Sequence, residues 1–207
     1  MDSEEISKRL VNRSRRKLLL LAAISVLPLI VAYALYYGGW RPTSTGNHGE
    51  LVQPPRSIED VALQLFDGKK IRFSDWHGKW TLLTFSAADC LAACEKNLYN
   101  IRQVITAQGS EAERVRSVLI VTDTRALDWL HYAIKDYPGM QVITGPDTEV
   151  QRLVKQFTLP NDSPSVRRNR IYLVDPLGNF IMIYEEGADP SGIRKDLTRL
   201  LRVSRIG

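Results

Sequence analysis

The longest uninterrupted apolar pattern in the chain covers twenty uncharged residues, Leu18 to Tyr37. Twenty helical residues span about 30 Å, the thickness of the hydrocarbon core of a bilayer, so this segment is predicted to be a transmembrane helix. Pro28 lies in its middle, where a membrane helix tolerates the kink that proline introduces. Aromatic residues gather at its C-terminal end, as expected at a membrane interface: Tyr33, Tyr36, Tyr37 and Trp40.

Basic residues crowd only the N-terminal flank of this segment. Residues 1–17 hold six lysines or arginines, whereas only Arg41 follows closely, so the positive-inside rule predicts a cytoplasmic basic tail over 1–17. A cleaved signal peptide with its cleavage motif at 32–34 is the alternative. The apolar run is longer than a usual signal-peptide core and contains that motif, which favours a retained single-pass anchor. Everything after Tyr37 then lies outside the cytoplasm, most simply on the periplasmic side of a bacterial inner membrane.

Residues 38–57 break the apolar pattern and are rich in Gly, Pro, Ser, Thr and Asn, which is typical of a flexible tether. Residues 58–207 are then predicted to form one domain. A β-hairpin is expected over 61–73 around Asp67-Gly68. Further strands are predicted at 81–85, 118–121, 141–144, 171–174 and 180–184, and helices from Cys90 onward, at 127–137, at 147–157 and from Asp189-Pro190. This alternation predicts an α/β domain whose central sheet is flanked by helices.

The net charge of +5 is distributed unevenly, because residues 1–17 alone supply +3 of it. No basic patch interleaved with aromatic residues stands out, so nucleic acid is not an expected partner. The chain also lacks Walker and GxGxxG loops.

The only two cysteines, Cys90 and Cys94, stand where the strand at 81–85 gives way to a helix. The free N–H groups and the dipole of a helix start favour thiolate over thiol, and disulfides persist outside the cytoplasm. We expect Cys90 to be the exposed nucleophile and Cys94 to be the partly buried resolving thiol. Two core thiols are the alternative, since Cys94 falls on an apolar helical stripe: Leu91, Cys94, Leu98, Ile101 and Ile105.

Charged residues near the cysteines are expected to have opposite effects on thiolate formation. Asp89 should oppose thiolate formation, whereas Lys96 and the basic cluster at 167–170 should favour it. The basic cluster is either a solvated loop or a docking site for an acidic partner.

Several stretches point to a known family. They are the Asp67-Gly68 hairpin, GKWTLLTFS, the CxxxC spacing of Cys90 and Cys94, VTDTRA, ITGPDTEVQRLVKQF and IYLVDPLGNFIMIY. From about Ile58 to Val203 the domain resembles the thioredoxin-like fold, and more closely the Sco/SenC family of cytochrome c oxidase assembly proteins, in which these elements occur in the same order. The resemblance implies that Cys90 and Cys94 are copper ligands or redox-active thiols, and that the partner is an oxidase subunit or another assembly factor.

The sequence departs from that family at two places. Leu91 and Glu95 stand where the family's cysteine loop carries prolines, and the segment 165–170, which matches the position of the family's copper-binding histidine, contains none. Three histidines remain as candidates for a third ligand, and none is well placed by sequence: His48 in the tether, His77 before the central strand, and His131 beside a helical stripe.

The sequence therefore predicts a membrane-anchored, periplasm-facing thioredoxin-like protein that assists cytochrome c oxidase assembly. Cys90 and Cys94 are its predicted catalytic residues for thiol–disulfide exchange. The same sulfurs suit transient Cu(I), which prefers soft thiolates, although no cofactor is required. The alternative is a scaffold of the same fold that only binds assembly partners.

Overall fold

The structure is a computed structural model of the 207-residue chain, and it describes residues 3–39, 46–125, 127–159, 162, 170–204 and 206, with side chains from residue 15 onward. The chain divides into two compact units, Met1–Thr45 and Gly46–Gly207.

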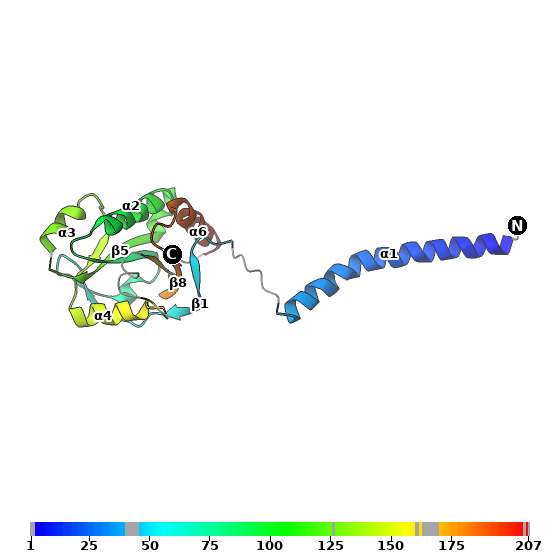
Figure 1. Ribbon diagram of the computed structural model, residues 1–207, viewed down its shortest axis with the longest axis horizontal. Coiled ribbons are helices and arrows are strands. Elements are labelled where there is room, and N and C mark those ends of the chain that lie inside the picture. The colour runs from blue at the N-terminus through cyan, green and yellow to red at the C-terminus, as the bar shows by residue number, and fades with distance from the viewer. Residues whose placement is uncertain are drawn as a thin grey trace. The chain divides into compact units, whose positions relative to one another are not determined.

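The first unit contains one long helix, α1 (Ser3–Tyr37; blue in Figure 1). Its segment Arg15–Tyr37 is long and apolar enough to cross a membrane, as the sequence predicted. The side chains of this segment are exposed, and those of Leu18 to Leu21 are each more than 60% exposed. A continuous apolar surface of this kind is typical of a segment that contacts lipid rather than a protein core.

The second unit is built on a six-stranded mixed sheet, with strand order β1-β8-β7-β4-β5-β6. Its strands are β1 (Glu50–Ser57), β4 (Trp80–Ala87), β5 (Val115–Asp123), β6 (Gln141–Ile143), β7 (Ile171–Val174) and β8 (Asn179–Tyr184). β4, β5 and β6 are parallel, whereas β7 is antiparallel to β4 and β8 to β7. The predicted hairpin forms a separate pair, β2 (Ala62–Gln64) and β3 (Lys70–Arg72).

Helices cover both faces of this sheet. They are α2 (Ala92–Thr106), α3 (Leu127–Ala133), α4 (Asp147–Gln156) and α6 (Pro190–Val203), with 3-10 turns η1 (Phe73–Trp76) and η2 (Gly109–Arg114). Figure 1 shows α4 on one face and α2 with α6 on the other. The alternation along β4 explains the two layers, since Phe85 packs against Phe157 of the α4 layer while Leu82 belongs to the core beneath α2 and α6. The predicted α/β architecture is confirmed.

The structure differs from the predicted tether over 38–57. Residues 50–57 form β1, which pairs with β8 at the edge of the sheet, and the second unit begins at Gly46. Sequence analysis missed this strand because of Pro54 and Pro55, since proline has no backbone N–H to donate to a neighbouring strand. An edge strand tolerates it, and the register of β1 shifts between Leu51 and Arg56 where the prolines lie.

The helix predicted over 127–137 is also shorter than expected, because α3 ends at Ala133. Residues 134–136 continue as turns, and the Tyr137 N–H donates to the Ile134 carbonyl. Pro138 disfavours the helical conformation at Tyr137, so the helix could not have included that residue.

Candidate disulfide site

Cys90 lies in the connection between β4 and α2, at the C-terminal end of the central strand, and Cys94 lies in the first turn of α2. The connection is held by two backbone hydrogen bonds, Ala88 N–H to the Asp123 carbonyl (2.9 Å) and Cys90 N–H to the Ala87 carbonyl (3.2 Å). Cys90 has φ +37°, in the left-handed region that residues with a side chain rarely adopt. The chain then enters α2 with Leu91 as the N-cap, so Cys94 is the third residue of the helix.

This geometry brings the cysteines together. Their Cα atoms are 5.1 Å apart, and their sulfurs form a disulfide with an S–S distance of 2.06 Å. The structure therefore pairs the two cysteines with each other.

Both cysteines are buried, and the expectation that Cys90 is exposed is wrong for this disulfide state. Cys90 is 1% exposed and Cys94 is 5% exposed. They belong to an apolar cluster with Leu130 of α3, with Ala88 of the β4–α2 connection, and with residues of α2, β5 and β6: Leu98, Leu119, Val121 and Val142. Sequence periodicity could not predict the burial of Cys90, because residues of α3, β5 and β6, which are distant in the sequence, contribute to this cluster.

Leu91 departs from the predicted apolar stripe of α2. It is 70% exposed, whereas Cys94, Leu98 and Ile101 are buried as expected. Leu91 precedes the first helical residue, so the helical period does not extend to it.

A buried polar chain runs beside the disulfide helix. Asn97 of α2 donates to the hydroxyl of Thr84 (3.3 Å), and this hydroxyl donates to the carbonyl oxygen of Arg170 (2.9 Å). These bonds join α2, β4 and the residue before β7, and sequence analysis did not identify them. The available signal was a polar residue, Thr84, between the apolar residues Leu83 and Phe85 of the strand, and another, Asn97, three positions after Cys94.

Arg170 does not have the role predicted for the basic cluster at 167–170. Its side chain is 10% exposed and forms salt bridges with Asp162 and Glu185. Desolvation lowers the pKa of the Arg170 guanidinium, but hydrogen bonds to Glu185 and Asp162 outweigh it and raise the pKa above its usual value. Arg170 therefore pairs with two carboxylates and is not a solvated charge. Arg167, Arg168 and Asn169 lie outside the described residues. Asp89 and Lys96 are exposed.

None of the three histidines is placed to complete a copper site with the two sulfurs. His131 is exposed and stacks on Phe66 with ring centroids 6.0 Å apart. His77 precedes β4, at the end of the strand opposite the cysteines, and His48 lies against α6. Within the described residues no three His, Cys, Asp or Glu side chains gather where a metal could bind. Two sulfurs joined in a disulfide do not fit the family's three-ligand copper site.

Comparisons with known proteins match the domain that carries this disulfide. A family described as "Transmembrane-like, thioredoxin-like, C-terminal domain" matches residues 80–204. The curated protein SCO1 homolog 1, mitochondrial, of Arabidopsis thaliana is 24% identical over 151 residues, which covers 67% of this chain and 45% of that protein. The match therefore spans less than half of the plant protein's length.

Solved structures of low identity share the fold. Yeast Sco1 with copper bound matches with a TM-score of 0.61 and 19% identity, over 72% of this chain and 91% of the yeast chain. BsSco, a Sco protein in which a disulfide switch was identified, matches with a TM-score of 0.57 and 17% identity, over 75% of this chain and all of its own. The predicted thioredoxin-like fold and the predicted resemblance to Sco proteins are confirmed.

Proposed function

Because this chain belongs to the family of transmembrane-like, thioredoxin-like C-terminal domains, we propose that it assists cytochrome c oxidase assembly by thiol–disulfide exchange at Cys90 and Cys94. The observation that carries the proposal is the disulfide at the junction of the central strand and α2. The similarity to BsSco, described as a member of a family of cytochrome c oxidase assembly proteins, supports the choice of process. In this proposal α1 anchors the chain, and the domain faces the periplasm.

The exchange reaction balances without a further reactant. A thiolate of the partner attacks one sulfur of the Cys90–Cys94 disulfide, forms a mixed disulfide and releases the other sulfur as a thiolate. A second partner thiol then attacks the mixed disulfide. The partner leaves oxidised to a disulfide, and this chain is left with two thiols. The reverse sequence, with Cys90 as the attacking thiolate, reduces a partner's disulfide.

The first turn of α2 stabilises a sulfur that becomes anionic. Cys94 is the third residue of α2, in the first turn, where the helix dipole is positive. Its own N–H donates to the Leu91 carbonyl at 2.7 Å, so the stabilisation comes from the dipole of the helix. A Cys94 thiolate is therefore a favourable leaving group when the partner attacks Cys90.

Attack requires local opening, because neither cysteine is accessible in the disulfide state. The cover includes Leu130 of α3, a helix of seven residues, and short elements open at lower free energy than the central strands.

No copper step follows from the two sulfurs alone. Once reduced they are soft ligands that suit Cu(I), but the described residues add no third ligand.

A non-catalytic scaffold is the second candidate function, and the burial of Cys90 favours it. A disulfide that is permanently enclosed stabilises a fold without exchanging with any partner. In this case the chain binds assembly partners through its surface.

Substitution of both cysteines separates the two candidates. The variant Cys90→Ser/Cys94→Ser, expressed in place of the native chain, should lose most oxidase assembly, measured as assembled enzyme and its activity. The matched control Ala92→Ser/Ala93→Ser adds two serines at the start of the same helix and keeps both sulfurs, so it should assemble oxidase normally. Full assembly by the double-cysteine variant at native protein levels would exclude the exchange function and favour the scaffold.

A further inference from the structure

The exposed charged residues of α6 are all basic. They are Arg194, Lys195, Arg199 and Arg202, which we call the α6 basic face. The single carboxylate of the helix, Asp196, points inward and is 2% exposed. None of the four cations forms a salt bridge with a carboxylate of the described residues. The positive charge of this face is therefore available to an external anion.

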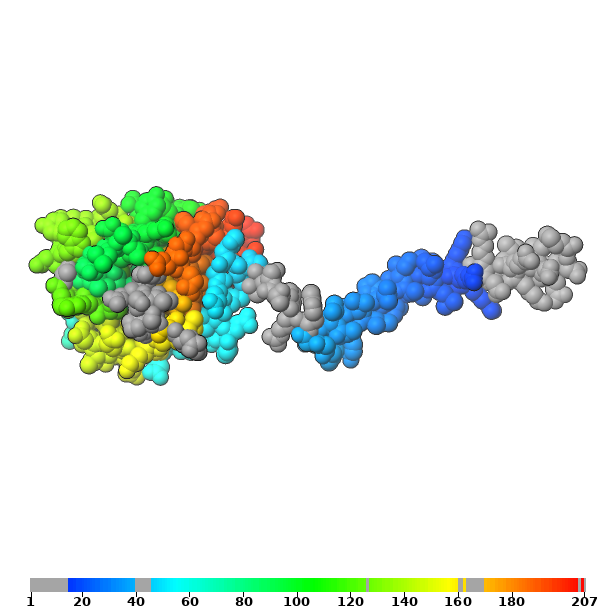
Figure 2. All heavy atoms as spheres, viewed as in Figure 1, coloured from blue at the N-terminus to red at the C-terminus, as the bar shows by residue number. Residues whose placement is uncertain are grey.

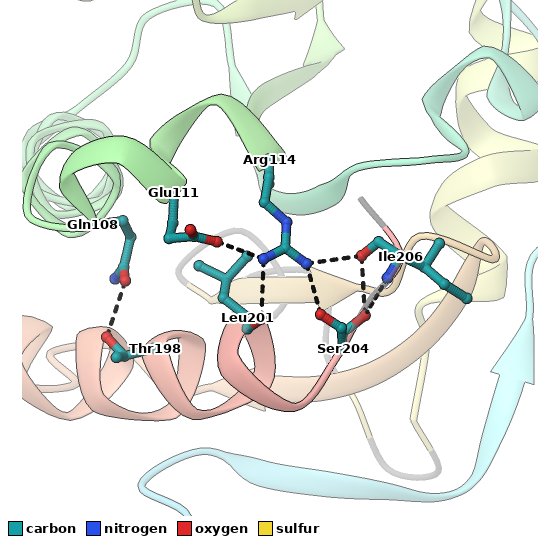
Figure 3. A network of polar contacts seen from close by, with 7 residues as sticks. All are labelled: Gln108, Glu111, Arg114, Thr198, Leu201, Ser204 and Ile206. Atoms are coloured by element: carbon teal, nitrogen blue, oxygen red, sulfur yellow. Dashed lines mark hydrogen bonds and ion pairs between the residues drawn. The ribbon is translucent and has the colours of Figure 1, made fainter.

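A hollow of about 500 Å³ lies beside this face, between η2 and α6. Arg114 in its wall donates to the Glu111 carboxylate, to the Leu201 carbonyl in the last turn of α6, and to the carbonyls of Ser204 and Ile206 beyond that helix (Figure 3). The charge of Glu111 is thus balanced within the wall. Arg194 and Arg202 also line the hollow, and they leave it with an excess of positive charge.

The first residues of the domain are tied to the same helix. The backbone N–H groups of His48 and Gly49 donate to Asp196 Oδ2 at 2.8 and 2.9 Å, and Arg199 donates to the Gly46 carbonyl at 3.0 Å. Gly192 permits this approach, since a Cβ there would lie 2.8 Å from the His48 side chain. The surface of residues 46–57 (cyan) lies next to that of α6 (orange to red) in Figure 2. The chain that leads to α1 therefore leaves the domain beside the α6 basic face.

The covalent chain limits how far this point can lie from a membrane. Nine residues lead from Tyr37, the end of the apolar segment, to Gly46. Even a fully extended chain of this length spans at most about 30 Å. If α1 is the anchor, as the proposed function holds, Gly46 stays within that distance of the lipid surface.

We propose that the α6 basic face docks on the headgroups of anionic phospholipids in the membrane that holds α1. Clustered lysine and arginine side chains next to a membrane segment are attracted to anionic lipid, and the attraction falls off within a Debye length. The short connection keeps the face within reach of that field. Docking orients the domain, with α6 toward the lipid.

Lysine footprinting of the full chain in lipid nanodiscs tests this proposal. One set of nanodiscs contains phosphatidylcholine alone, and the other contains phosphatidylcholine with phosphatidylglycerol. An acylating reagent modifies Lys195 on the α6 basic face and Lys70 on β3, and mass spectrometry measures both rates. Lys195 should react about tenfold more slowly in the anionic nanodiscs, and high salt should restore its rate. The rate of Lys70 should be the same in both lipids.

Charge reversal supplies the matched variants. Arg194→Glu/Arg202→Glu should abolish the lipid dependence at Lys195. Lys79→Glu/Lys155→Glu, which makes the same change in net charge at exposed residues outside α6, should preserve it. Equal Lys195 rates in both lipids would overturn the proposal and leave an acidic protein as the occupant of the face. Failure of the chain to enter nanodiscs would instead refute the anchor, whereas the cysteine variants test the exchange function independently.

Discussion

At the scale of single residues, Asp196 is the clearest case of a polar side chain that organises its surroundings. Its buried carboxylate accepts hydrogen bonds from the backbone N–H groups of His48 and Gly49 and from the hydroxyl of Tyr184 at 3.4 Å. Desolvation raises the pKa of Tyr184, and the charge of Asp196 raises it further, so the hydroxyl stays protonated and donates. One side chain thus joins the start of the domain, β8 and α6.

Substitution of Asp196 should release the start of the domain. We expect Asp196→Ala to lower the free energy of unfolding by on the order of 2–3 kcal/mol, because two backbone donors lose a charged acceptor. Denaturant titration measures the loss, and hydrogen exchange at Gly49 should accelerate. Asp196→Asn keeps an acceptor oxygen and should lose less. Equal stability of the native chain and the alanine variant would show that these hydrogen bonds contribute nothing.

Asp60 should make stability depend on pH in the acid range. Its Oδ1 accepts from the Ser74 N–H at 3.0 Å, and this bond, followed by the bond from Arg72, lowers the pKa of Asp60 below its usual 3.8. A lowered carboxyl pKa in the folded state stabilises the fold above pH 3.8, and the contribution is lost as pH falls through the lowered value.

Replacement of Asp60 tests whether its contribution to stability is lost as the pH falls. Asp60→Asn should lower the free energy of unfolding at pH 7 by on the order of 1 kcal/mol, since the site is exposed and screened. The difference from the native chain should shrink as the pH falls below 3.8. Glu113→Gln, at an exposed carboxylate that forms no salt bridge with a described residue, should change little at either pH. If the free energy of unfolding of the variant stayed below that of the native chain by the same amount at every pH, the lowered pKa of Asp60 would not stabilise the fold.

At the scale of elements, local patterns predicted most of the sheet. β7 was predicted over its full length because four apolar residues end at a turn rich in Pro, Gly and Asn, and α6 because Asp189-Pro190 is a favourable helix start. β1 was missed because its prolines favour a loop unless the strand lies at an edge. The burial of Cys90 and the ion pairs of Arg170 were missed for another reason. Their partners, Leu130, Asp162 and Glu185, come from other elements and leave no local signal.

The β4–α2 connection should change most when the disulfide is reduced. The φ of +37° at Cys90 costs roughly 1–2 kcal/mol for a residue with a Cβ, and this residue is one end of the short loop that the disulfide closes. Once reduced, Cys90 is free to relax outward, whereas Cys94 stays fixed within α2. We expect a limiting dose of thiol reagent to label Cys90 before Cys94 in the reduced chain, as resolved by peptide mass spectrometry.

The native disulfide form should not react with the thiol reagent under the same conditions, which controls for damage during reduction. Equal and very slow labelling of both cysteines after reduction would identify them as two core thiols. That outcome would also weaken the exchange function, because the attacking thiolate must reach a partner.

At the scale of the whole molecule, the basic flank of α1 predicts the side on which the domain lies. A reporter fused after Gly207 should be active only outside the cytoplasm, because six basic residues precede the apolar segment. The mature protein should also retain Met1 to Lys17. A mature N-terminus at Leu35, just after the motif at 32–34, would show cleavage and contradict the retained anchor.

The hydrogen bonds of residues 46–49 also decide where this protein can be cut. A soluble fragment that begins at Gly46 keeps both N–H donors of Asp196 and the carbonyl that Arg199 binds. A fragment that begins at Glu50 leaves an aspartate in a buried position without those donors, at a cost of several hydrogen bonds. Truncation of the domain should therefore be planned from these bonds rather than from the composition of the preceding segment. For the same reason, a protease that releases the domain intact must cleave before Gly46.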